Sequence, residues 1–157
     1  MQIQITRHTG KAHSIVFRRA DGSETWQPSD DFFIRHDLSH YAIEKTLGYK
    51  TAFLGMIEKG MGVRDFEDRA KRKSMLITTE AWYAENMANL FLMERTQGKM
   101  EDFNSVSRET FAQLQLSVPP PNLTNTEVAA IRKLLEELLQ QWNSLANNES
   151  ILLTIDI

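Results

Sequence analysis

With 157 residues, 41% of them hydrophobic and 25% charged, the chain has the composition of one globular domain with a buried core. Its formal net charge of −3 gives no reason to expect a nucleic-acid partner, and the absence of cysteine excludes disulfides, thiol catalysis and thiolate metal sites. No stretch approaches the roughly 20 apolar residues that cross a bilayer, and the first residues contain no apolar signal segment. We therefore expect a cytoplasmic protein with no membrane partner.

Residues 1–27 predict an antiparallel β-meander. Polar and apolar side chains alternate over residues 2–6, which is the period of a half-buried strand. A second strand, rich in β-formers, is expected over 14–19. Asp21-Gly22 is a two-residue hairpin signal, and a short third strand follows it.

The pattern of residues 36–59 predicts a helical hairpin. Its first helix carries the side chains that indicate a metal site or a catalytic site. His36, His40 and Glu44 follow one another at four-residue intervals, so each step turns about 40° and one side of a helix can present all three. Two imidazoles and a carboxylate are a ligand set for a divalent metal such as zinc. Asp37 lies beside them and can act as a base or as a group that orients a ligand.

The same segment supports a structural interpretation. Asp37 is a suitable N-cap for a helix that begins at Leu38, and Gly48 can end that helix in a left-handed conformation. His40 projects toward apolar side chains of its own helix, as a core histidine would. We prefer this interpretation at the level of sequence, because the pattern completes no known catalytic set.

The segment that follows is polar. Acidic residues between 63 and 68 partly cancel the basic run at 69–73, and no aromatic platform or recognisable nucleic-acid fold accompanies it. This run is typical of a solvated face or a loop, and we expect no nucleic acid to bind there.

Residues 78–147 predict three helices. Thr78 or Thr79 caps a long helix that reaches about Thr96, and a second helix covers 102–114. Three acids of the long helix, Glu80, Glu85 and Glu94, can each complete a metal site, and spacing does not choose among them.

A triple proline at 119–121 forces an extended connector before the last helix. Thr124 and Glu127 form a capping box, and behind them apolar residues recur three and four apart through nearly three heptads. Such a stripe suits a core face or a dimer seam. Leu134 and Leu139 broaden it, which favours the core and leaves a weak homodimer open.

Residues 150–157 predict a final strand. A lone strand cannot satisfy its backbone groups, so we expect it to join the N-terminal meander. The predicted fold is therefore a single α+β domain over residues 1–157, in which the meander and the C-terminal strand form a small antiparallel sheet packed against four or five helices.

Two enzyme motifs match the central segment incompletely. The zinc-protease motif H-E-x-x-H has glutamate where this chain has Asp37, which is one methylene shorter. The His36-Asp37 doublet resembles that of HD-type phosphohydrolases, but those all-helical enzymes also need a histidine on an upstream helix. The chain has no phosphate-binding loop and no nucleophile elbow, which disfavours NTPases, dinucleotide-dependent enzymes and serine hydrolases.

A larger resemblance covers about residues 35–60, which include HDLSHYAIEKTLGYKTAFLGMIEKG. This segment resembles a pattern shared by small bacterial proteins of uncharacterised function. The pattern consists of an HDL-x-H segment, an acid four residues later, then LG, an aromatic-containing run and a closing glycine. The resemblance implies that His36, Asp37, His40 and Glu44 form a unit. It implies no activity.

Two classes of function follow from the sequence. The first is a binding or structural module for an unknown small molecule or protein, in which these four residues shape the helix. The alternative is a metal-binding protein, including a metal-dependent hydrolase, in which His36, His40 and Glu44 hold the ion and Asp37 is the catalytic base.

Overall fold

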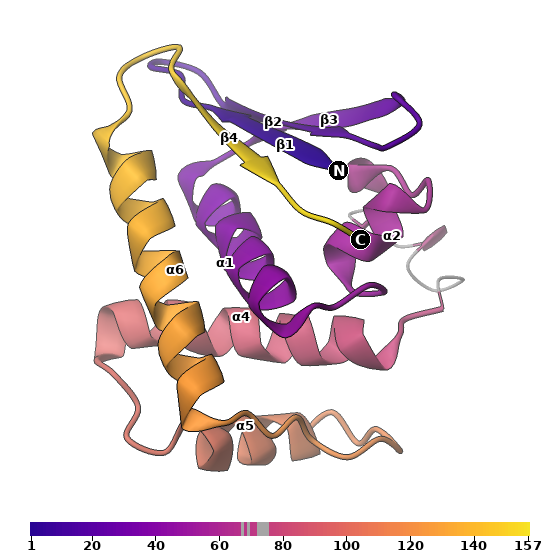
Figure 1. The fold of residues 1–157 in the computed structure, drawn as a ribbon, viewed down its shortest axis with the longest axis vertical. Helices are drawn as coiled ribbons and strands as arrows, with labels where there is room; N and C mark the ends of the chain where they lie inside the picture. The colour runs from indigo at the N-terminus through magenta and orange to yellow at the C-terminus, as the bar shows by residue number, and fades with distance from the viewer. Residues whose placement is uncertain (67, 69, 72–75) are drawn as a thin grey trace.

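A four-stranded antiparallel sheet lies along one side of the computed structural model, and helices cover one of its faces (Figure 1). The structure describes residues 1–66, 68, 70–71 and 76–157. The strands are β1 (Gln2–Thr6), β2 (His13–Arg18), β3 (Glu24–Ser29) and β4 (Ser150–Thr154), in the order β3-β2-β1-β4. The predicted meander is confirmed.

The C-terminal strand joins the sheet as predicted. β4 pairs antiparallel with β1, and the register places Ile5 opposite Ile151 and Ile3 opposite Leu153. All four side chains are buried on the face that meets the helices, so the alternation seen in the sequence marks the inner face of the sheet. With helices on that face, the α+β fold class is confirmed.

Helix α1 lies at the centre of the molecule, between the sheet, α4 and α6 (Figure 1). The described helices are α1 (Asp31–Leu47), α2 (Phe53–Glu58), the 3₁₀ turn η1 (Val63–Phe66), α4 (Thr79–Gln97), α5 (Phe103–Ala112) and α6 (Asn125–Ser144). Helix α4 crosses beneath α1 on the side away from the sheet, and α5 lies beyond α4. Because α1 is enclosed on several sides, polar residues on it are buried as well as apolar ones.

The predicted start of α1 at Leu38 with Asp37 as its cap is wrong. The N-cap is Asp30, whose side chain accepts a hydrogen bond of 3.0 Å from the Phe33 amide. Trp142 of α6 then fixes the first turn, because its indole Nε1 donates to Asp31 at 2.8 Å. This contact comes from far along the chain, and it leaves Asp37 inside the helix with no capping role.

The other helix boundaries follow local signals. Gly48 ends α1 with φ +67°, and Thr78 caps α4. Thr124 and Glu127 form the expected capping box of α6. The apolar stripe of α6 is buried within the domain, which confirms it as a core face; a weak homodimer stays a prediction.

The segment between α2 and α4 is described only in part. Residues 63–66 form η1, while Arg69, Arg72 and Lys73 of the basic run lie outside the described residues. Among the helices that are described, none is both long enough and apolar enough to cross a membrane.

Candidate metal centre

Helices α1 and α4 bring together two histidines and a glutamate. Glu85 of α4 places one carboxylate oxygen 3.5 Å from Nε2 of His36 and the other 3.2 Å from Nε2 of His40. One ligand atom from each residue lies within 4.8 Å of the other two. The two imidazole rings meet edge to face with their centroids 4.7 Å apart. This cluster offers two imidazole nitrogens and one carboxylate at one point.

The helix crossing explains how Glu85 reaches α1. Ala81, Ala84 and Ala88 are buried on α4, and such small side chains let two helices approach closely. Glu85 follows Ala84 and therefore lies at the margin of this contact face. Of the three acids that the sequence left open, the structure brings Glu85 to the histidines.

The other two acids of α4 are engaged elsewhere. Glu80 accepts hydrogen bonds from the backbone amides of Lys50 and Thr51, which secures the loop before α2. Glu94 pairs with Arg132 of α6. Spacing alone could not separate these roles, because each depends on which element α4 meets at that turn.

Glu44 lies on the other edge of the His40 ring, away from the converging ligand atoms. Its Oε1 is 3.2 Å from Nδ1 of His40, and its Oε2 accepts a hydrogen bond of 2.9 Å from the Leu54 amide. Because Glu44 is fully buried and held by two partners, it fixes the orientation of the ring. The predicted set of His36, His40 and Glu44 therefore does not converge on one point, since His40 separates Glu44 from His36. In the structure Glu85 takes that place.

The charges of the cluster are strongly coupled. Burial lowers the pKa of His40, but the hydrogen bonds to Glu44 and Glu85 outweigh it and raise this pKa to about 9. Burial acts to raise the pKa of Glu85, yet its contacts with His36 and His40 hold it well below its usual range. For Glu44 burial prevails and its pKa is raised. Without a metal, His40 is thus an imidazolium between two carboxyl groups.

Asp37 stands next to this cluster, and one of its carboxylate oxygens has no hydrogen-bond partner among the described residues. Its Oδ2 is buried and accepts no hydrogen bond from the described residues. Burial raises the pKa of Asp37 to about 6, against the opposing effect of His40 and His36. A carboxyl group in this state can take up and release a proton near neutral pH.

A cavity of about 410 Å³ adjoins the cluster. His36, Asp37, His40 and Glu85 form one part of its lining, and aromatic side chains form much of the rest. Its volume falls in the range of about 300–1,000 Å³ that small-molecule sites occupy. The cluster therefore opens into a space that a small ligand can enter.

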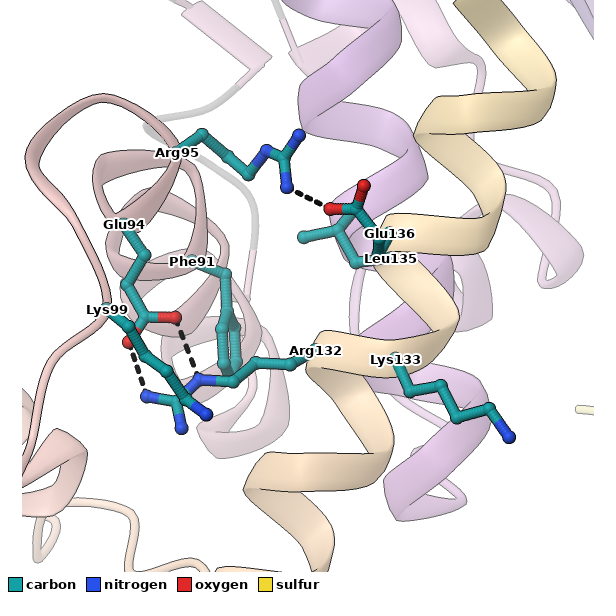
Figure 2. Close-up of a pocket in the computed structure, with 8 residues that line it drawn as sticks. All are labelled: Phe91, Glu94, Arg95, Lys99, Arg132, Lys133, Leu135 and Glu136. Carbon is teal, nitrogen blue, oxygen red and sulfur yellow. Dashed lines mark hydrogen bonds and ion pairs between the residues drawn. The ribbon is translucent and has the colours of Figure 1, made fainter.

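A second cleft, of about 350 Å³, lies between α4 and α6 (Figure 2). Arg132 reaches across it and pairs with Glu94, and Arg95 pairs with Glu136. These four groups neutralise one another across the two helices. The two ion pairs therefore join α4 to α6 across the cleft.

Comparison with protein-family models, with curated proteins and with solved structures finds no match to this chain. The resemblance of residues 35–60 to small bacterial proteins accordingly stays a prediction. Any function assigned to the chain has to rest on the geometry of its own residues.

Proposed function

We propose that this protein binds a divalent transition metal through His36, His40 and Glu85, and that it uses the ion to hydrolyse a small substrate. The observation that carries the proposal is the convergence of three ligand atoms from α1 and α4 at the wall of a cavity. Three protein ligands and one open position are the usual arrangement of a catalytic zinc site, and two histidines with one carboxylate also suit non-haem iron.

The spacing of the donor atoms supports the proposal. Ligands that lie about 2.0–2.1 Å from a tetrahedral zinc ion are about 3.3–3.4 Å apart. The separations of 3.2 Å and 3.5 Å between Glu85 and the two histidines are close to this value, but they are made by two different oxygens of Glu85. One donor atom from each of the three residues lies within 4.8 Å of the other two, so binding of one ion would draw these atoms closer together. Glu44 adds the further contact that metal-binding histidines usually have, because it holds the remaining ring nitrogen of His40.

Asp37 supplies the acid–base function. A bound divalent ion would act as a Lewis acid and make water a better nucleophile at neutral pH. Asp37 lines the same cavity, and its buried Oδ2 has no hydrogen-bond partner among the described residues, so this carboxylate can accept the proton that the attacking water loses. This role agrees with the catalytic base that the sequence suggested.

A structural bridge is the second candidate function of the cluster. It is favoured by the hydrogen bonds of His40 to both Glu44 and Glu85, which connect α1 to α4 without any ion. Removing one member of the buried His40–Glu44 pair is strongly destabilising. Both proposals therefore predict unstable variants, and only the response to metal separates them.

The test is metal binding by the purified chain, without a histidine tag, at pH 7.5. Chelator-treated wild type should take up one zinc, manganese or iron(II) ion and unfold at a higher temperature when the ion is added. Glu85→Gln should lose most of this shift. Glu109→Gln, which changes an exposed acid on α5, should keep it. A wild type that neither takes up an ion nor changes its melting temperature would leave the structural bridge as the function.

Hydrolysis has a separate test. With 4-nitrophenyl acetate as probe, the metal-loaded wild type should exceed the rate of the free ion, and Asp37→Asn should lower this rate by a factor of about 100 or more. Asp37→Asn should still bind the metal, since Asp37 is not one of the three ligands. Equal rates in the two proteins would exclude Asp37 as the base.

A further inference from the structure

The lining of the cavity beside the proposed metal site includes a second buried polar group that has no partner in the part of the chain that the structure describes. Gln27 of β3 is 9% exposed, it lines the cavity, and its Oε1 is buried without a hydrogen-bond partner among the described residues. An unpartnered buried acceptor is unfavourable, so a native group of this kind requires an explanation. Gln27 and Asp37 are therefore two residues of the cavity lining that each have an unsatisfied buried oxygen.

The position of Gln27 is set by the sheet. Burial alternates along β3, so that Gln27 faces the helices while its neighbour Trp26 faces the other way and is 55% exposed. An apolar residue would be the ordinary occupant of the inner face, as Ile15 and Phe17 are on β2. A glutamine there brings an unpartnered hydrogen-bonding group to the wall of the cavity.

The walls of the cavity restrict what can lie against Gln27. Phe33, Phe53, Phe66 and Trp82 supply aromatic surface from α1, α2, η1 and α4. Among the described lining residues there is no lysine or arginine, while Asp37 and Glu85 are both acidic. Such a lining disfavours an anionic ligand and offers contact surface to an aromatic or branched apolar body.

We propose that the cavity binds a small carboxamide with such a body, and that Gln27 selects it by accepting a hydrogen bond from the amide N–H. This inference rests on the proposed function, because the carbonyl oxygen of the amide would occupy the open position of the metal. Two polar contacts then fix the orientation of the amide group, and the apolar body lies against the aromatic walls.

The reaction that follows is amide hydrolysis. Water adds its hydroxyl group to the carbonyl carbon and the C–N bond breaks. The proton that water loses passes by way of Asp37 to the leaving nitrogen, so the products are a carboxylic acid and an amine or ammonia. Water is the one co-reactant, and no electron is transferred to or from the chain.

The test compares two probes of the same shape. Benzamide and acetophenone share an aromatic ring and a carbonyl group, but acetophenone has a methyl group in place of the NH₂ and cannot donate to Gln27. We expect the zinc-loaded wild type to bind benzamide about tenfold more tightly in isothermal titration calorimetry, which is the effect of one hydrogen bond to a buried acceptor. Gln27→Leu should bind the two probes equally and keep its affinity for acetophenone.

Two further variants control for the cavity and for the strand. Phe33→Ala removes an aromatic side chain from the cavity wall and should lower the affinity for both probes. Because Phe33 is 51% exposed, the fold should not change. Trp26→Ala changes the neighbouring residue on the opposite face of β3 and should leave the preference for benzamide unchanged. Because an amide oxygen is also a stronger ligand for zinc than a ketone oxygen, the same comparison on metal-free wild type isolates the hydrogen bond to Gln27 even where Gln27→Leu does not fold.

The zinc content of every sample separates this inference from the proposed function. A wild type that binds zinc but takes neither probe, or takes both equally, overturns the carboxamide inference and leaves the metal centre standing; the buried oxygens then hold only water. A preference for benzamide that persists in Gln27→Leu also overturns it. A wild type that binds no zinc contradicts the proposed function, and the same two probes on the metal-free protein still test the hydrogen bond to Gln27.

Discussion

Asp37→Asn should stabilise the metal-free protein at neutral pH, although it removes the proposed catalytic base. The pKa of Asp37 is raised from 3.8 to about 6 by burial. Because the folded state holds this proton more tightly than the unfolded state, the carboxyl group favours folding at low pH. That contribution is lost as the pH rises from about 4 to about 6.

The size of the effect follows from the two pKa values. The difference between 3.8 and about 6 corresponds to about 3 kcal/mol at pH 7.5, at about 1.36 kcal/mol for each pH unit. Asparagine has the shape of aspartate without the charge, but it leaves a polar group unpartnered at the same place. We therefore expect Asp37→Asn to raise the free energy of unfolding by about 1–3 kcal/mol at pH 7.5 and to change it little at pH 4.

The assay is urea unfolding with chelator present at pH 4, 5.5 and 7.5. Asp31→Asn is the matched control, because it is the same substitution on the same helix. Burial acts to raise the pKa of Asp31, but hydrogen bonds from Arg35 and Trp142 outweigh it and lower this pKa. Asp31→Asn should therefore reduce stability at pH 7.5. A lower stability of Asp37→Asn at pH 7.5, or a difference that does not vary with pH, would refute the reasoning.

The remaining predictions concern the buried cluster and the fold. His40 has its pKa raised from 6.5 to about 9, so the metal-free protein should lose up to about 3 kcal/mol of stability between pH 6.5 and pH 9, and His40→Gln should flatten this dependence in urea unfolding. Deleting residues 150–157 removes the strand paired with β1 and should give insoluble protein; an unchanged melting temperature would count against this. Leu135→Ala should cost about 2–5 kcal/mol and Leu152→Ala, on an exposed residue, less than about 0.5 kcal/mol. Sedimentation of the wild type at several concentrations tests the weak homodimer.

Local signals in the sequence were enough to predict most of the secondary structure. Alternation marked the strands, and the caps at Thr78 and Thr124 and the left-handed Gly48 marked helix ends, because these interactions join residues a few positions apart. The start of α1 was predicted wrongly. Two acids, Asp30 and Asp37, could each cap a helix, and the contact from Trp142 that holds the first turn is made by a residue far along the chain.

The candidate site also has one part that the sequence predicted and another that only the tertiary structure decided. Helical periodicity by itself placed His36, Asp37 and His40 together, because their spacing is a property of one helix. It also placed Glu44 beside His40, but periodicity does not say which nitrogen of the ring a neighbour meets. The tertiary structure decided that Glu44 holds Nδ1 and leaves Nε2 to the cluster.

Only the packing of distant elements could supply the rest of the site. Glu85 reaches His40 from 45 positions along the chain because α4 crosses α1, and Gln27 reaches the cavity because β3 turns that side chain toward the helices. Neither residue carries a local signal, since a glutamate on a helix and a glutamine on a strand are ordinary surface residues. Their positions depend on the surfaces that the sheet and the helices present to one another, and those surfaces exist only in the folded chain.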